Sequence, residues 1–140
     1  TGLQIRIAVG HNNTQRVHIQ KLADQFGNVT LIEQQDYVSS LARAHVAVLA
    51  AGSSLWEACA VGTPSIGLVV ADNQFASANA AKKLGFTRVV DCRVRFNVDA
   101  VLNEVQACIL GGTPAMRGAA LSAGVANGAS MVARELGAIA

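Results

Sequence analysis

Short apolar runs alternate with longer amphipathic stretches along this chain. The apolar runs predict strands at Leu3–Val9, Val29–Ile32, Val46–Ala50, Ser65–Val70 and Thr87–Asp91. Helical spacing of apolar residues predicts helices after Thr14, over Tyr37–Ala44, Leu55–Val61, 75–84 and Val98–Leu110, from Pro114, and lastly through Val132, Leu136 and Ile139. This alternation is typical of βαβ units. We therefore expect an α/β fold with a doubly wound (Rossmann-like), mostly parallel sheet flanked by helices.

The apolar positions also predict which faces are buried. The run Val46–Ala50 lacks polar alternation, which predicts a strand covered by helices on both sides. Apolar residues at helical spacing predict inward-facing stripes. These stripes comprise Ile19, Leu22, Ala23 and Phe26 in the first helix, Val38 and Leu41 in the second, and Val98, Val101, Leu102, Val105, Cys108 and Ile109 in a later one.

Ligands of open parallel sheets bind outside the carboxyl ends of the strands. In this chain those ends lead into the turns that follow Val9, Ala50 and Val70. The turn Ala51–Ser54 joins a buried strand to a helix, so its backbone N–H groups favour an anion. An alternative needs no ligand, because Ser54 with Glu57 three residues later forms a capping-box pattern.

Two further features bear on the choice between a bound ligand and a capping box. Glu57 carries a carboxylate near a helix start, where it could accept hydrogen bonds from both hydroxyls of a ribose. The next strand ends in Asp72, Asn73 and Gln74, whose carboxylate and amides suit sugar hydroxyls. The alternative is that Asp72 or Asn73 caps the following helix.

Composition narrows the class of protein. At 140 residues the chain fits one domain, residues 1–140, and its net charge of +2 is too slight and scattered for nucleic acid to be a main partner. The cysteines and histidines lack the spacing of a disulfide framework or metal site, so we expect neither metal nor cofactor. No apolar run is long enough to span a bilayer, which leads us to expect a cytoplasmic protein.

The segment from Ala50 to Gly85, AAGSSLWEACAVGTPSIGLVVADNQFASANAAKKLG, resembles the C-terminal half of UDP-sugar enzymes with the GT-B glycosyltransferase fold. It is most similar to the UDP-sugar hydrolase of pseudaminic acid synthesis and to spore-coat polysaccharide proteins. It is more distantly similar to the peptidoglycan N-acetylglucosaminyltransferase. The combination G-S-S-x-x-E, G-x-P and A-D-N-Q carries the resemblance.

The resemblance implies a role for each matching residue. Gly52, Ser53 and Ser54 would contact the diphosphate and Glu57 the ribose. The residues Asp72, Asn73 and Gln74 would face the sugar.

The first turn departs from the family pattern. The family usually carries a Gly-Gly pair near the phosphates, whereas this chain has Gly10, His11, Asn12 and Asn13, of which Gly10, Asn12 and Asn13 are candidate substrate contacts. His11 is a polar-turn imidazole that could act as a base, but no adjacent carboxylate supports it, and a surface or phosphate-contact role is favoured.

Two more positions bear on where the nucleotide base would bind. In this fold uracil is typically held by backbone groups of a loop near the middle of the domain, for which Gln34–Val38 is the candidate. Trp56 is expected to be a core or interdomain anchor rather than a base-stacking residue.

The chain begins at Thr1–Gly2 without Met, which suggests an excised domain. In the resembling hydrolases the catalytic His lies in a Gly-rich loop of an N-terminal domain that this chain lacks. The implied function is therefore UDP-sugar binding in a nucleotide-sugar hydrolase, with no catalytic residue here. A glycosyltransferase half-domain and a stand-alone non-catalytic binding module are the alternatives.

Overall fold

The computed structural model describes residues 2–128, 130 and 133–134. The helix predicted through Val132, Leu136 and Ile139 lies outside the described residues. The chain divides into two compact units, an N-terminal unit of residues 1–41 and a C-terminal unit of residues 42–140.

In the N-terminal unit, strand β1 (Ile5–Ala8) leads to helix α1 (Arg16–Ala23) and strand β2 (Val29–Ile32). The two strands are parallel, with Ile5 opposite Val29 and Ala8 opposite Ile32. A short 3₁₀ turn, η1 (Gln34–Asp36), then starts helix α2 (Tyr37–Ala42), which leads out of this unit.

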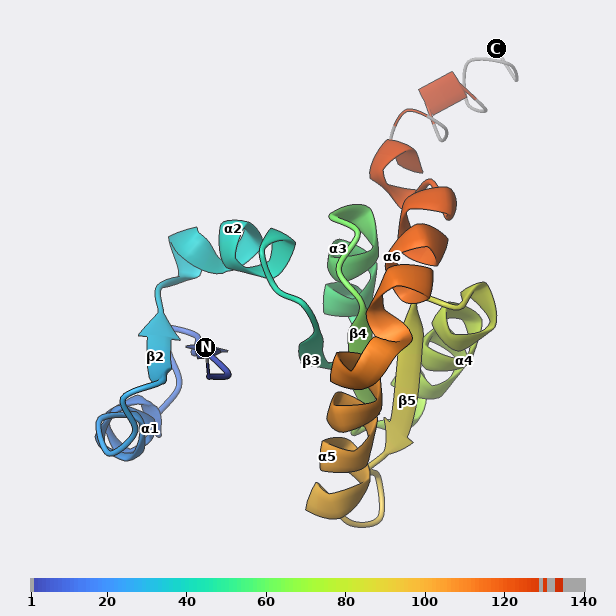
Figure 1. Cartoon of the computed structure of the whole chain (residues 1–140). Helices are drawn as coiled ribbons and strands as arrows, with labels where there is room; N and C mark the ends of the chain where they lie inside the picture. The colour runs from blue at the N-terminus through green and yellow to red at the C-terminus, as the bar shows by residue number, and fades with distance from the viewer. Residues whose placement is uncertain (1, 129, 131–132, 135–140) are drawn as a thin grey trace. The chain divides into compact units, whose positions relative to one another are not determined.

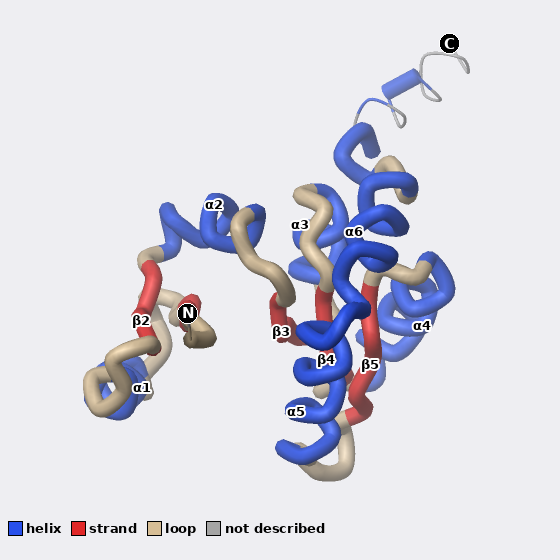
Figure 2. The backbone as a smooth tube through the Cα atoms, in the orientation of Figure 1, coloured by secondary structure: helices blue, strands red, loops and turns tan. Residues whose placement is uncertain are grey.

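The C-terminal unit holds three parallel strands, β3 (Ala47–Ala50), β4 (Ser65–Val69) and β5 (Thr87–Asp91), with β4 in the middle (Figure 2). Helix α3 (Ser53–Ala60) connects β3 to β4. The 3₁₀ turn η2 (Asp72–Gln74) and helix α4 (Phe75–Leu84) connect β4 to β5. Helix α5 (Val98–Ala107), the helical stretch η3 (Cys108–Gly112), helix α6 (Thr113–Ser122) and the 3₁₀ turn η4 (Val125–Asn127) follow β5.

Alternate residues of β4 face opposite layers of helices. Val69 belongs to a buried cluster with Leu55 of α3 and Ala78 of α4. Ile66 belongs to a second cluster with Val101 of α5 and Met116 of α6. In Figure 1 α5 accordingly lies over the sheet of β4 and β5. The structure confirms an α/β fold of parallel strands flanked by helices, with the described pairing arranged as one sheet in each unit.

Two left-handed glycines mark the turns that precede β4 and β5. Gly62, before β4, has φ 72°, and Gly85, which ends α4 as predicted, has φ 85°. Both turns lie against α6, because a Cβ on Gly62 would meet the Leu121 side chain at 2.9 Å and one on Gly85 would meet Ala119 at 3.5 Å. Helix α6 therefore packs at the amino ends of the strands and leaves their carboxyl ends uncovered by it.

The burial of β3 differs from the prediction. The strand lies at the edge of its sheet, and Val48 is 44% exposed, whereas the run Val46–Ala50 predicted cover on both sides. The helices contact β4 and β5 more than they contact β3, so this outer strand receives less cover. An apolar run alone does not distinguish a central strand from an edge strand.

Several predicted inward positions are also exposed. Val101 and Cys108 are buried, as predicted, but Val98, Leu102 and Ile109 lie on the flank of the same helical stretch. The short strands of the N-terminal unit offer little apolar surface for its helices. In that unit Ala23 and Leu41 are buried as predicted, whereas Leu22, Phe26 and Val38 are exposed.

Candidate functional site

The turn after β3 leaves the start of α3 without a side-chain cap. The helix begins at Ser53, its N-cap residue is Gly52, and no side chain accepts a hydrogen bond there. Gly52 N–H donates to Ala50 O at 2.8 Å, and the N–H groups of Ser53 and Ser54 have no acceptor among the described residues. The alternative of a Ser54–Glu57 capping box is therefore wrong.

The reason is one of register. The non-helical backbone of Gly52 (φ −99°, ψ −146°) makes it the N-cap, so Ser54 is the second helical residue and Glu57 falls in the second turn rather than the first. A capping box requires its hydroxyl residue at the N-cap position. Glu57 is consequently exposed and is not engaged by a cap.

The approach to this helix start is open. A Cβ added to Gly52 would meet no atom within 4 Å, and Ser53 is exposed, whereas Ala51 behind them is fully buried. Unpaired N–H groups at a helix N-terminus attract negative charge. The turn can therefore receive an anionic group, such as a phosphate, close to the backbone.

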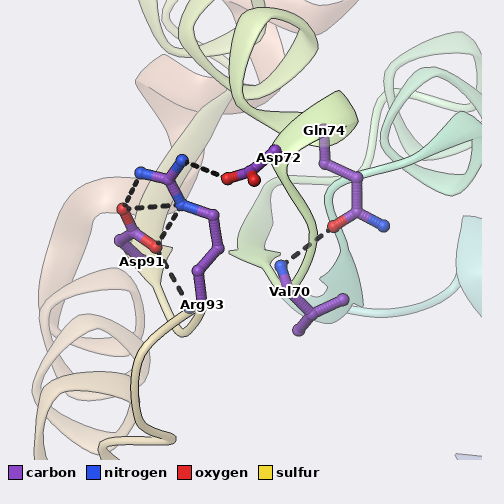
Figure 3. Close-up of polar contacts among 5 residues, drawn as sticks. All are labelled: Val70, Asp72, Gln74, Asp91 and Arg93. Carbon is purple, nitrogen blue, oxygen red and sulfur yellow. Dashed lines mark hydrogen bonds and ion pairs between the residues drawn. The ribbon is translucent and has the colours of Figure 1, made fainter.

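The turn after β4 is held by its own side chains. The Gln74 side-chain oxygen accepts a hydrogen bond from Val70 N–H at 3.0 Å (Figure 3). The N-cap residue of α4 is Gln74 itself, and no side chain forms a capping hydrogen bond there, so the alternative that Asp72 or Asn73 caps this helix is wrong. Those two residues lie upstream of the cap in η2, where Asn73 is exposed.

Arg93 connects this turn to the end of β5. Its Nη1 lies 2.8 Å from Asp72 Oδ1, its Nη2 lies 2.6 Å from Asp91 Oδ2, and its Nε lies 3.0 Å from Asp91 Oδ1 (Figure 3). Hydrogen bonds from Arg93 lower the pKa of Asp91 from its ordinary 3.8 to about 2. The same partners, Asp91 first and then Asp72, raise the pKa of the Arg93 guanidinium.

Sequence reasoning missed Arg93 and Asp91. Asp91 ends a predicted strand, so the rule that placed Asp72 at a carboxyl end applies to it as well. Arg93 carries no such signal, because its contact with Asp72 joins residues 21 positions apart.

In the C-terminal unit, the turns after β3, β4 and β5 all lie at the carboxyl ends of the parallel strands. Ala50 pairs with Leu68, and Val69 pairs with Asp91. The structure thus brings the predicted residues of the β3 and β4 turns to one edge, each after its own strand. Trp56 is not one of these turn residues. Its Nε1 donates to Ser77 Oγ at 2.9 Å and its ring packs against Phe86, which confirms the predicted core anchor.

The first predicted turn belongs to the N-terminal unit. Asn13 Oδ1 accepts a hydrogen bond from Gln15 N–H at 2.8 Å, whereas His11 and Asn12 are exposed. Helix α1 begins at Arg16 with Gln15 as its N-cap residue, rather than directly after Thr14 as predicted. The Asn13 turn extends the loop by one residue before the helix starts.

A cavity of about 210 Å³ opens beside this turn, within the N-terminal unit. Residues from the ends of β1 and β2 and from the start of α2 line it: Ala8, Val9, Gly10, Ile32, Gln34 and Tyr37. Arg16 connects two segments next to this cavity. Its Nη1 donates a hydrogen bond to Val9 O at 3.0 Å, and its Nη2 lies 2.6 Å from Glu33 Oε1. The cavity thus brings Gly10 together with part of the predicted Gln34–Val38 loop.

Two absences concern only the described part of the chain. There, no group of three or more His, Cys, Asp or Glu side chains could hold a metal ion. Within the same residues, no helix combines the length and apolar character needed to cross a membrane.

The fold and these strand-end turns define an α/β protein built on parallel sheets. No protein-family model matches the chain, and no curated protein matches it. Among solved structures it is similar to one described as the glycotransferase of kitacinnamycin, with a TM-score of 0.48 and 18% identity over 96% of this chain. The chain spans 43% of the length of that structure. A likeness this weak leaves the function to be argued from the site itself.

Proposed function

We propose that this chain is a UDP-sugar-binding domain of a nucleotide-sugar hydrolase that acts in the cytoplasm in surface polysaccharide or nonulosonic acid biosynthesis. The observation that carries the proposal is the uncapped start of α3 beside the exposed carboxylate of Glu57. A domain that used this turn only for structure would gain stability from a side-chain cap at Gly52.

The diphosphate is assigned to Gly52, Ser53 and Ser54. The open space above Gly52 admits a phosphate to the backbone, and the Ser53 and Ser54 N–H groups supply donors. Negative charge grows on the departing UDP when the glycosidic bond to phosphate breaks. Donors fixed in place before the reaction stabilise such charge without reorganisation.

The ribose and the sugar are assigned to acidic and amide side chains. The exposed Glu57 side chain forms no hydrogen bond to the described residues, so both carboxylate oxygens are available to the ribose hydroxyls. Asp72, Asn73 and Gln74, on the turn after the neighbouring strand, are assigned to the sugar.

In the N-terminal unit, the cavity beside Gly10 is the candidate for the uracil ring. Its apolar walls come from Val9, Ile32 and Tyr37, and Gln34 contributes polar groups. Asn12 and Asn13 are kept as further candidate contacts in this unit, where the Asn13 side-chain oxygen accepts a hydrogen bond from Gln15 N–H. His11 remains the low-ranked candidate for a catalytic group.

The base that activates water is assigned to an N-terminal domain outside this sequence, as the resemblance implies. Residues 1–140 then act as one nucleotide-sugar-binding domain, which holds the leaving group, with no metal or other cofactor. The proposal therefore predicts that the isolated chain binds UDP and does not hydrolyse UDP-sugars.

The test is titration of the 140-residue chain with UDP and with AMP, followed by calorimetry and by amide chemical shifts. We expect UDP to shift the amide resonances of residues 52–57, and Glu57→Gln to weaken UDP binding about tenfold by removing a charge-assisted acceptor. AMP carries a ribose and one phosphate but lacks uracil and the second phosphate, so it tests the preference for a uridine diphosphate over another nucleotide. The proposal fails if AMP binds as tightly as UDP or if UDP leaves residues 52–57 unshifted.

A further inference from the structure

Arg93 is the one side chain that joins the end of β5 to both η2 and the first residue of α4 in the described part of the chain. It forms a two-pronged pair with Asp91 and a single contact with Asp72 Oδ1 at 2.8 Å. Its guanidinium also lies 4.6 Å from the centre of the Phe75 ring. Figure 3 shows the guanidinium between the two carboxylates.

The pair with Asp91 fixes the guanidinium before it meets Asp72. Arginine presents its donors in a planar fork, so a carboxylate bound by two of them sets the direction of the others. The backbone N–H of Arg93 also donates to Asp91 Oδ1, at 3.1 Å. An isolated exposed ion pair contributes little stability, but this set of contacts restricts the position of one side chain.

Asp72 is consequently held by one oxygen and open at the other. Its side chain is 93% exposed, and Oδ1 alone is engaged by Arg93. Gln74, which closes the same turn through its oxygen on Val70 N–H, keeps its amide nitrogen free of hydrogen bonds to described residues. The turn thus offers a carboxylate acceptor and an amide donor group, a combination that matches a sugar hydroxyl, which both donates and accepts.

We propose that Arg93 is the positioning residue of this sugar-facing turn: it holds Asp72 so that Oδ2 accepts a hydrogen bond from a hydroxyl of the bound sugar. This rests on the proposed function, because it takes Asp72 to face the sugar. Arg93 also offsets one of the two carboxylates at this edge. Without it, Asp72 and Asp91 would leave two uncompensated negative charges near an anionic ligand.

Arg95 provides a matched control. It lies two residues further along the same exposed loop, and no described residue forms a hydrogen bond or ion pair with it. Arg93→Met and Arg95→Met remove the same charge from the same loop, and only the first removes the contact with Asp72. Arg93→Lys keeps the charge but lacks the planar fork.

The experiment measures how much more tightly the chain binds UDP-glucose or UDP-N-acetylglucosamine than UDP. We expect the wild-type preference to fall about tenfold in Arg93→Met, as for loss of a charged hydrogen bond, and to stay unchanged in Arg95→Met. Arg93→Lys should restore little of it. Asp72→Asn should reduce this preference to a similar extent. The double variant Arg93→Met/Asp72→Asn should reduce it no further, because each single change already removes the same interaction with the sugar.

Ligand-free spectra supply an independent measurement. Arg93→Met should shift the amide resonances of residues 71–75, and Arg95→Met should not. Normal UDP binding combined with an unchanged sugar preference in Arg93→Met overturns this inference alone. An equal affinity of wild type for UDP and both UDP-sugars overturns it as well, whereas a failure of UDP to bind at all removes the proposed function together with it.

Discussion

Trp56 on α3 donates a hydrogen bond from its indole nitrogen to the hydroxyl of Ser77 on α4, at 2.9 Å. The same ring meets Phe86 edge-on, with centroids 5.6 Å apart and planes at 62°. Aromatic pairs favour this arrangement. The two helices that follow the β3 and β4 turns are therefore tied to each other by a directional contact as well as by apolar packing.

Replacing Trp56 by Phe should lower the free energy of unfolding by about 1–2 kcal/mol, because the hydrogen bond is lost and some ring contact with it. Ser77→Ala should cost about 1 kcal/mol or more, since it leaves a partly buried indole N–H without its partner. Urea denaturation followed by circular dichroism measures both. An unfolding midpoint unchanged in both variants would show that the contact does not stabilise the unit.

Gly67→Ala and Gly52→Ala form a matched pair of glycine substitutions. A Cβ at Gly67 would lie 3.1 Å from a methyl group of Leu55, which is fully buried, so we expect a loss of about 1–3 kcal/mol in the free energy of unfolding. A Cβ at Gly52 would meet no atom within 4 Å. That variant should lose only about 0.5 kcal/mol, because alanine is a poorer N-cap residue than glycine, and should lose affinity for UDP, as measured by denaturation and calorimetry. Equal stability losses would contradict the assignment of open space above Gly52.

The pH dependence of the Asp91–Arg93 pair has a defined sign. The pKa of Asp91 is lowered to about 2 in the folded state, so the ionised carboxylate favours folding. This contribution is complete above the ordinary value of 3.8 and disappears as the pH falls through about 2. A carboxyl carbon titration by NMR should give a midpoint near 2 for Asp91, and Arg93→Met should return it toward 3.8. A midpoint near 3.8 in the wild type would rule out a persistent pair.

Asn97 caps α5, because its side-chain oxygen accepts a hydrogen bond from Ala100 N–H at 3.0 Å. Asn97→Ala should therefore lower the free energy of unfolding by about 1 kcal/mol. Asn103, exposed in the middle of the same helix, is the control. Asn103→Ala should leave stability unchanged or raise it slightly, since alanine is the better helix former. Thermal denaturation of both variants is sufficient, and equal effects would contradict a capping role.

Strand positions could be predicted from the sequence because apolar runs bounded by turn residues are a local signal. Val29–Ile32 and Thr87–Asp91 match the structure at both ends, and the strand predicted over Ser65–Val70 ends one residue earlier. The start of α3 could not be fixed in the same way. Ser53 and Ser54 both resemble N-cap residues, and only the backbone conformation of Gly52 shows that the N-cap is neither of them but Gly52 itself.

Only those parts of the candidate site that directly follow the carboxyl end of a strand could be predicted from the sequence. That rule located the turns of Gly52 and Asp72, whereas Arg93 depends on a contact across the sheet edge that no local pattern records. Burial was the least predictable property. The same apolar spacing covers Val101, which is buried against β4, and Leu102, which is 57% exposed.

Helix α6 contributes to both buried clusters, through Met116 on one side of the sheet and Ala120 on the other. These residues are four positions apart and so lie on the same face of the helix. A single helix thus closes both layers at the amino ends of the strands. The two layers should consequently exchange their amide protons at similar rates, because neither can open without displacing the element that they share.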